Sequence, residues 1–145
     1  MKANLYVREI EAVFKPNKGQ KKVKIKRSKD AYQLFCDMED ATQEKLIALH
    51  LAGDSAVLCF QVVHIGSINF AVINSADILR TALLTGATSL IVLHNHPSGD
   101  PTPSPEDKKM VQQVKQACDL LQFKLFDSII IGKDKYFSAA DEGQL

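Results

Sequence analysis

The segment from Leu93 to Asp107, which reads LHNHPSGDPTPSPED, constrains the fold more than any other part of the chain. It follows an apolar run and contains His94 and His96, whose side chains share one face of a strand because strand side chains alternate. The prolines and the glycine that follow predict a chain reversal, which brings Asp107 back at the start of a helix. Three protein ligands with one open position are what a catalytic zinc ion needs. The segment therefore predicts a metal site made of His94, His96 and Asp107.

Ser104 and Asp107 also have a purely structural interpretation. A serine followed by Pro105 suits the N-cap of a helix, and Asp107 can then complete a capping box and favour the helix dipole. Capping does not explain two histidines two residues apart at the end of a buried strand, where neutral imidazoles need hydrogen-bond partners. The pair of histidines therefore carries the metal prediction.

Two other classes of metal-dependent enzyme use similar residues, but this sequence does not match their motifs. Nucleases named for the letters His-Asn-His disperse those residues through a strand and a helix, whereas here they are contiguous. A zinc deaminase needs His-x-Glu followed by Pro-Cys-x-x-Cys. The sequence contains no such pair of cysteines.

The composition bounds the size and the compartment of the protein. With 145 residues, 46% of them hydrophobic, the chain is long enough for one domain with a core and short for two. No apolar run reaches the roughly 20 residues of a membrane helix, and the N-terminus lacks the apolar block of a signal peptide. We therefore expect a soluble, cytoplasmic protein with no membrane segment. Cys36, Cys59 and Cys118 are expected to be reduced, buried thiols, and His50 and His64 to be satisfied or at the surface.

A basic segment stands near the N-terminus. The stretch from Lys15 to Lys29 holds eight basic residues and no acidic one, which leaves 10 basic and 17 acidic residues for the rest of the chain. Such a segment can attract nucleic acid or an acidic protein surface. It is also what a solvated strand edge looks like, because lysines on an edge discourage unwanted strand pairing. Both interpretations remain open at this point.

Apolar periodicity predicts strands and helices along the chain. The expected strands, of which the first two form a hairpin, comprise residues 5–13, 22–26, 44–53, 55–66, 69–73, 89–93, 124–132 and 136–137. Helices are expected from an N-cap at Ser28 to about residue 40, from Ser75 to Gly86, and over residues 105–121. The second helix is expected to pack its apolar residues inward (Ile78, Leu79, Ala82, Leu83 and Leu84). This order predicts an α/β fold with a mixed β-sheet flanked by helices.

The spacing of the candidate ligands resembles a known motif. His94-x-His96, seven residues, Ser104, two residues and Asp107 resemble the JAMM signature of the JAB/MPN metalloprotease family, and HNHPSGDPTPS is similar to its bacterial RadC-type branch. The resemblance covers about residues 40 to 145. It implies a mixed sheet between helices, a deaminase-like α/β/α sandwich. The chain would then divide into residues 1–40, a basic hairpin and first helix packed onto the rest, and residues 41–145, a JAB/MPN metalloprotease-like domain.

The resemblance also implies an activity. Members of the family use Zn²⁺ to cleave peptide or isopeptide bonds of protein substrates, in some cases beside a ubiquitin-like modifier. It places the catalytic glutamate at Glu44, as general base for the attacking water, and it gives Ser104 the role of hydrogen-bond donor to the oxyanion. Without the resemblance, Glu44 would pass for a solvated strand end. The alternatives are a nucleic-acid-associated module, in which Lys15 to Lys29 bind and the metal is structural or vestigial, and an interaction scaffold.

The chain departs from the RadC-type pattern at three places, which involve four residues. Ala76 and Asp77 stand where Arg-Glu is usual, Val111 stands where a threonine is usual one turn after the metal aspartate, and Ser128 stands where a histidine is usual. The metal ligands themselves are intact. The departures bear on the surroundings of the ligands and on the choice of substrate.

Overall fold

A mixed five-stranded sheet forms the centre of the protein, with the strand order β2-β1-β3-β4-β5. The computed structural model describes residues 11, 13, 21–69 and 73–145. The strands are β1 (Lys45–Leu51), β2 (Val57–Ile65), β3 (Ser89–Asn95), β4 (Lys124–Ile131) and β5 (Tyr136–Ser138). Only β3 and β4 run parallel, and the other neighbours are antiparallel. The predicted mixed sheet is therefore confirmed.

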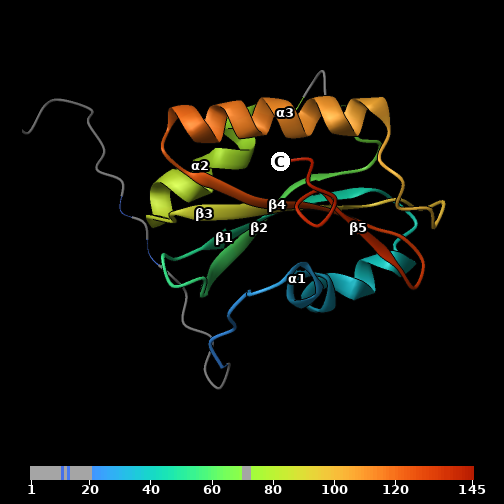
Figure 1. The fold of residues 1–145 in the computed structure, drawn as a ribbon, viewed down its shortest axis with the longest axis horizontal. Coiled ribbons are helices and arrows are strands. Elements are labelled where there is room, and N and C mark those ends of the chain that lie inside the picture. The colour runs from blue at the N-terminus through green and yellow to red at the C-terminus, as the bar shows by residue number, and fades with distance from the viewer. Residues whose placement is uncertain (1–10, 12, 14–20, 70–72) are drawn as a thin grey trace, which may run out of the picture.

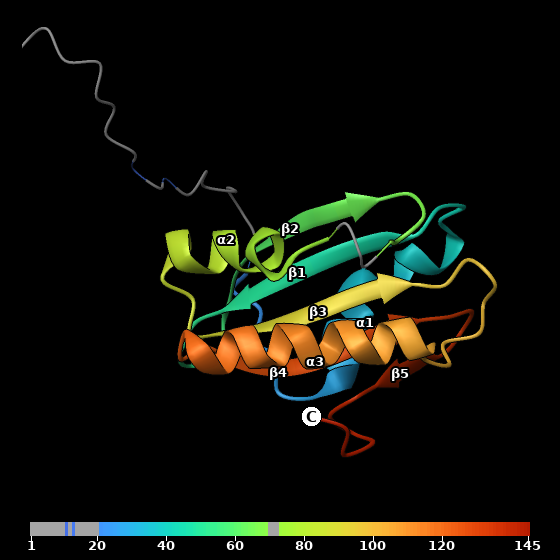
Figure 2. The ribbon, with the colours of Figure 1, turned by 90° about the horizontal axis from the view of Figure 1, so that it is seen from above.

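Helices cover both faces of this sheet. Helix α1 (Ser28–Phe35) and the short 3-10 helix η1 (Cys36–Asp40) pack on one face, and α2 (Ser75–Thr85) and α3 (Pro105–Leu120) lie over the other, as Figures 1 and 2 show. The α/β fold class expected from the sequence is thus confirmed. None of the helices in the described residues is both long enough and apolar enough to cross a lipid bilayer.

Strand β3 lies in the middle of the sheet and is buried along its whole length. Its side chains alternate between two apolar clusters: Ile91 and Leu93 pack on the α1 side, and Leu90 and Val92 pack under α2 and α3. Each fully buried aliphatic side chain contributes about 1.5–3 kcal/mol to the free energy of unfolding. The same alternation places His94 on the α3 side of the sheet.

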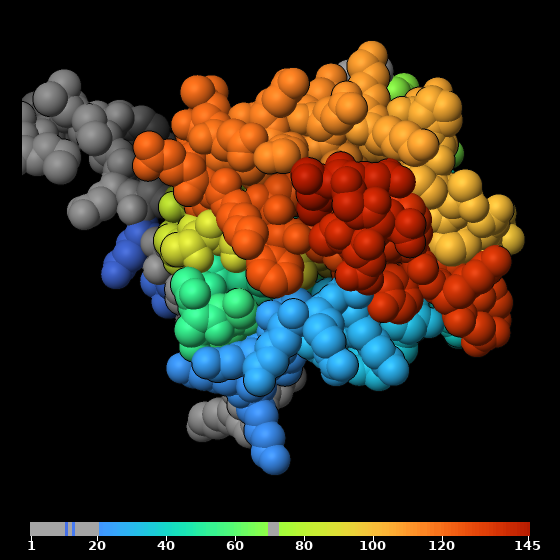
Figure 3. All heavy atoms as spheres, viewed as in Figure 1, coloured from blue at the N-terminus to red at the C-terminus, as the bar shows by residue number. Residues whose placement is uncertain are grey.

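The C-terminal segment is held against the sheet by a buried carboxylate. Asp127 accepts hydrogen bonds from Ser138 Oγ at 2.6 Å, Ala140 N at 3.0 Å and Ser128 N at 2.7 Å. Figure 3 shows the segment, in red, filling the face between α3 and α1. Burial raises the pKa of Asp127, although these hydrogen bonds oppose the shift.

Part of the basic segment pairs with the sheet at the start of β2. Val57 N donates to Val23 O at 2.8 Å and Ile25 N donates to Ser55 O at 3.0 Å, around an antiparallel bridge from Lys24 to Ala56. Residues 22–26 therefore meet the start of β2. The expected partner strand at residues 5–13 falls almost entirely outside the described residues, as does most of the expected strand 69–73.

Helix α1 begins one residue earlier than predicted. Arg27 is the N-cap and Ser28 is the first helical residue. The Asp30 carboxylate satisfies the start of the helix instead, since its Oδ2 accepts from Lys26 N and Arg27 N at 2.9 Å each. The Ser28 hydroxyl donates to Asp141, which ties the helix to the C-terminal segment.

Two of the expected inward residues of α2 lie at the surface. Leu83 is 59% exposed and Leu84 is 53% exposed. The buried stripe consists of Ile78, Leu79 and Ala82. At about 100° of rotation per residue, Leu84 lies on the opposite side of the helix from this stripe and Leu83 lies on its flank. The predicted end at Gly86 is confirmed, with a φ of 68°.

The cysteines are free, as expected, but they are not all buried. Cys118 is buried in α3, Cys59 is half-buried in β2 and Cys36 is exposed. Burial raises the pKa of the Cys118 thiol to about 11. The expectation of three buried thiols is therefore wrong for Cys36, which lies at the start of η1 on the outer side of the fold.

His50 lies in the buried interior of β1. It is 0% exposed, and neither ring nitrogen has a partner among the residues that the structure describes. The expectation of a satisfied or surface histidine is wrong here, whereas His64 is half-buried and its Nε2 lies 3.1 Å from Ser67 O. Burial lowers the pKa of His50 to about 4.

We expect His50 to make the protein sensitive to acid. The unfolded chain binds a proton on this residue near pH 6.5, whereas the folded chain binds it only near pH 4. Stability is therefore present above pH 6.5 and falls as the pH drops from 6.5 to 4, by roughly 3 kcal/mol from this group. Urea unfolding of the wild type and of His50→Leu, at several pH values, measures the effect. The variant should lose less stability in this window, and parallel pH curves would contradict the prediction.

Candidate metal centre

Two imidazoles and one carboxylate meet at the α3 side of the sheet. His94 Nε2 lies 3.1 Å from Asp107 Oδ1, and His96 Nε2 lies 3.3 Å from Asp107 Oδ2. The two Nε2 atoms are 3.1 Å apart. His94 stands near the end of β3, His96 directly follows that strand, and Asp107 stands in the first turn of α3. The sequence motif is thus gathered into one cluster.

The spacing of these atoms suits a metal ion. Around zinc, with bonds of about 2.0–2.1 Å in a tetrahedral arrangement, neighbouring ligand atoms stand about 3.3 Å apart. The three observed separations range from 3.1 to 3.3 Å. His94 and Asp107 are buried and His96 is half-buried, so a bound ion would be held mostly away from solvent. The cluster could therefore hold a metal ion.

A hydrogen bond at His96 Nδ1, on the side of the ring away from the cluster, orients the ring for metal binding. Its Nδ1 lies 2.8 Å from the carbonyl oxygen of Asp100. A carbonyl can only accept, so Nδ1 carries the proton and a neutral ring points the Nε2 lone pair at the cluster. A lone pair facing a carboxylate is repulsive unless a cation or a second proton lies between them. This is the orientation of metal-binding histidines.

The electrostatics of the cluster favour positive charge at its centre. The hydrogen bond to Asp107 raises the pKa of His96, and burial opposes this only in part. Burial alone would raise the pKa of Asp107, but His94 and His96, which donate to it when they carry a proton on Nε2, outweigh burial and hold that pKa well below its ordinary value. The carboxylate is therefore ionised at neutral pH and available as a ligand.

The loop after His96 is tied to the end of β4. His96 N donates to Ile131 O at 2.9 Å, and Lys133 N donates to Gly99 O at 2.9 Å. Gly132 has no room for a side chain, because a Cβ there would lie 2.5 Å from Gly99 O and 2.7 Å from Pro101 Cδ. The reversal that brings Asp107 back to the histidines is thus packed against the sheet.

Ser104 serves as the N-cap of α3, as the sequence predicts. Its Oγ accepts from Asp107 N at 3.1 Å, and Asp107 Oδ2 accepts from Ser104 N at 2.7 Å. Capping and ligation are compatible, because Asp107 Oδ1 faces His94 and Oδ2, which has two lone pairs, can accept from Ser104 N and still face His96. Since Ser104 Oγ accepts the capping bond, its hydrogen is available to donate elsewhere.

Glu44 lies at the same end of the sheet. It precedes β1, whose Leu46 pairs with His94. Glu44 Oε2 accepts from Ile68 N at 2.8 Å, and its carbonyl oxygen accepts from Gly66 N at 2.9 Å. Both the backbone and the carboxylate of Glu44 are therefore fixed by the segment that follows β2.

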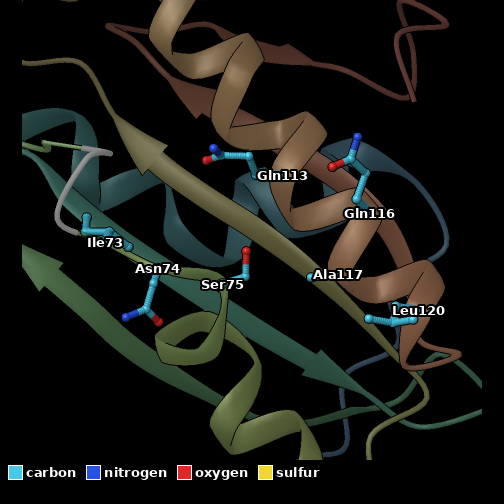
Figure 4. Close-up of a pocket in the computed structure, with 7 residues that line it drawn as sticks. All are labelled: Ile73, Asn74, Ser75, Gln113, Gln116, Ala117 and Leu120. Carbon is cyan, nitrogen blue, oxygen red and sulfur yellow. The ribbon is translucent and has the colours of Figure 1, made fainter.

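All five predicted site residues line one cleft of about 370 Å³. Its walls are formed by Glu44, Ile68, His94, His96, Pro97, Ser98, Ser104, Glu106 and Asp107. A larger groove of about 500 Å³ runs between α2 and α3, but Figure 4 shows amide, hydroxyl and aliphatic side chains there and none that titrates. The metal cleft is the candidate functional site within the described part of the chain, because the His94–His96–Asp107 cluster lines it.

Two of the departures from the family pattern lie behind the cluster. Val111 and Ser128 line a second cavity of about 240 Å³, which Asp107 also borders. Ala76 lies elsewhere, as an exposed residue in the first turn of α2. Two of the residues around this cavity beside Asp107 thus depart from the RadC-type pattern.

One buried polar residue of the site was missed by sequence reasoning. Asn95 is 0% exposed and contacts the backbone on both sides of Glu44. The sequence alone assigned Asn95 no role of its own between His94 and His96. A polar residue at the end of an otherwise apolar, fully buried strand is the signal that could have singled it out.

Comparisons with known proteins find related sequences along most of the chain. A family model described as the RadC-like JAB domain matches residues 25–144. A UPF0758 protein of Aquifex aeolicus is 37% identical over 142 residues, which cover 97% of this chain and 62% of the relative. UPF0758 proteins of Methanosarcina mazei and Roseiflexus castenholzii are 39% and 36% identical, and their matches cover 84% and 86% of this chain. The chain spans 54% to 62% of the length of these three relatives.

Proposed function

The chain belongs to the RadC-like JAB domain family, and from this membership we propose that it is a zinc-dependent hydrolase that cleaves a peptide or isopeptide bond. The observation that carries the proposal is the convergence of His94, His96 and Asp107 in a cleft that Glu44 and Ser104 also line. Two imidazoles and one carboxylate leave one coordination position open, as catalytic zinc sites do. Nitrogen and carboxylate ligands in a small tetrahedral cluster favour zinc over the larger, oxygen-preferring calcium ion.

The three ligands would bind the ion with complementary charges. His96 presents a neutral nitrogen, because its other nitrogen donates to Asp100, and Asp107 supplies one negative charge. A zinc ion bound there would supply Lewis acidity and make a water molecule acidic enough to lose a proton near neutral pH. The remaining roles belong to the side chains around it.

Glu44 acts as the general base in this proposal. Its Oε2 is held by Ile68 N, which leaves Oε1 to accept the proton of the attacking water. The same carboxyl group then returns that proton to the departing amine, so that one residue serves both halves of the hydrolysis. A positioned acid or base of this kind contributes about 10²–10⁴-fold to the rate.

Ser104 stabilises the negative charge that develops on the carbonyl oxygen. Its Oγ is fixed by the bond from Asp107 N, so its hydroxyl hydrogen can be donated into the cleft. Donors that are placed before the reaction begins stabilise the oxyanion without reorganisation. The residue thus combines a helix cap with a catalytic contact.

The proposed substrate is a protein or peptide, and a bond beside a ubiquitin-like modifier follows from the resemblance to JAB/MPN metalloproteases. The whole protein's substrates and partners belong to the same proposal, because the chain spans only part of its relatives. Nucleic-acid binding by Lys15 to Lys29 stays a prediction. Within the described part of that segment, Lys24 pairs with Asp54 at 2.8 Å and Arg27 lies 3.6 Å from Asp30.

Metal analysis combined with substrate profiling tests the proposal. Protein purified without chelators should contain about one zinc ion per chain and should cleave members of a peptide or isopeptide library. Chelation should stop cleavage and added zinc should restore it. A stable wild-type protein that binds no metal, or one that cleaves nothing in either library when loaded with zinc, would rule the proposal out.

A further inference from the structure

Asn95 joins the strand of the metal ligands to the segment that carries the base. It is the last residue of β3, between His94 and His96, and strand alternation turns its side chain away from the ligand cluster. Its Oδ1 accepts from Lys45 N at 2.7 Å, and its Nδ2 donates to Gln43 O at 3.1 Å. One side-chain amide therefore bonds to the residue before Glu44 and to the residue after it.

The backbone ladder between β1 and β3 stops at Leu46, two residues after Glu44, and these two bonds continue the connection beyond it. The ladder between β1 and β3 runs from Leu51 and Ser89 to Leu46 and His94, and it goes no further toward the N-terminus of β1. Residues 43–45 lie beyond it on that side. The Asn95 side chain supplies one acceptor and one donor to this segment, as the backbone of a further strand residue would.

The position of Glu44 is then set from three directions. Asn95 fixes the backbone on both sides of it, Gly66 N bonds to its carbonyl oxygen, and Ile68 N bonds to its carboxylate. Only the Asn95 contacts come from the strand that also presents His94. Together with the Leu46–His94 pair at the end of the ladder, they connect the segment of the proposed base to the strand of the proposed metal ligands.

We propose that Asn95 is a positioning residue, which holds Glu44 at its working distance from the His94–His96–Asp107 cluster. The inference rests on the proposed function, because it assigns Glu44 the role of base. A displacement of about 1 Å of a reacting group can cost about 100-fold in rate. Loss of the amide should therefore lower kcat, and it should affect KM and zinc affinity little, because the ligands keep their own contacts.

A double-mutant cycle separates positioning from a general structural role. In Asn95→Ala, kcat should fall about 10- to 100-fold at nearly unchanged KM. In the Glu44→Gln background the same substitution should have no further effect, because the group that it positions is already inactive. The matched control is Ser138→Ala, which removes another buried side-chain hydrogen bond, to Asp127, on the far side of β4. It should lower stability and leave kcat at the wild-type value.

Amide hydrogen exchange gives a readout that needs no substrate. The Lys45 amide should be protected in the wild type and exchange much faster in Asn95→Ala, while amides of the neighbouring β1–β3 ladder keep their protection. Asn95→Ser, which retains one hydroxyl, serves if the alanine variant does not fold. Equal losses of kcat in both backgrounds, a kcat at the wild-type value, or unchanged Lys45 protection would each overturn the inference. If the wild type cleaves nothing, the hydrolase proposal fails, and the exchange at Lys45 still decides whether Asn95 holds this segment.

Discussion

Asp107→Ala is expected to abolish zinc binding and turnover together. The substitution removes the only anionic ligand of the cluster, and two imidazoles alone do not make a three-ligand site. It also removes the carboxylate that accepts from Ser104 N, so the start of α3 loses about 0.5–2 kcal/mol of capping. Metal analysis after dialysis should show a fall from about one zinc ion per chain to nearly none, with no measurable cleavage.

Asp107→Asn separates the two roles of this residue. The asparagine keeps an oxygen for Ser104 N and removes the negative charge, so stability should stay near that of the metal-free wild type while zinc affinity falls at least 10-fold. If Asp107→Ala retained one zinc ion per chain and full turnover, Asp107 would be only a helix cap.

Glu44→Gln is expected to keep the metal and lose turnover. The amide has nearly the shape of the carboxylate, and its oxygen can still accept from Ile68 N, so the cleft should be unchanged. It cannot take up a proton from water. We therefore expect kcat to fall about 10²–10⁴-fold at an unchanged zinc content. Steady-state kinetics on a substrate from the library, with metal analysis of the same preparation, measure both quantities.

Glu106→Gln is the matched control for this prediction. Glu106 is a second carboxylate of the same cleft, and it is exposed. Its neutralisation should leave kcat within a few-fold of the wild-type value, because the proposal gives it no part in proton transfer. A Glu44→Gln variant as active as Glu106→Gln would show that another group is the base.

Local sequence signals predicted the features of the site that lie within one segment. The apolar run of β3 followed by His94 and His96, and the cap formed by Ser104 and Asp107, are short-range patterns, and the structure contains each of them. Short-range patterns work here because strand alternation and helix capping depend on neighbours in the chain. The fold class followed from the order of such elements.

Contacts between distant segments could not be predicted in the same way. The bonds from Asn95 to the backbone around Glu44 depend on the register of β1 against β3, and a shift by one residue would turn every side chain to the other face. The bond from Ile68 to Glu44 depends on where the chain returns after β2. Tertiary packing also leaves His50 without a hydrogen-bond partner among the described residues, although nothing in its neighbours in the sequence distinguishes it.

The absence of a side chain at Gly132 has a consequence for how this motif can change. The loop between His96 and Ser104 rests directly on that glycine, with Gly99 O 2.5 Å from the place of a Cβ. Most surface loops accept extra residues at little cost in stability. This loop should not, because an insertion would move it away from Gly132 and would displace His96. The length of the seven-residue interval between His96 and Ser104 is therefore fixed by its contact with Gly132, the residue directly after β4.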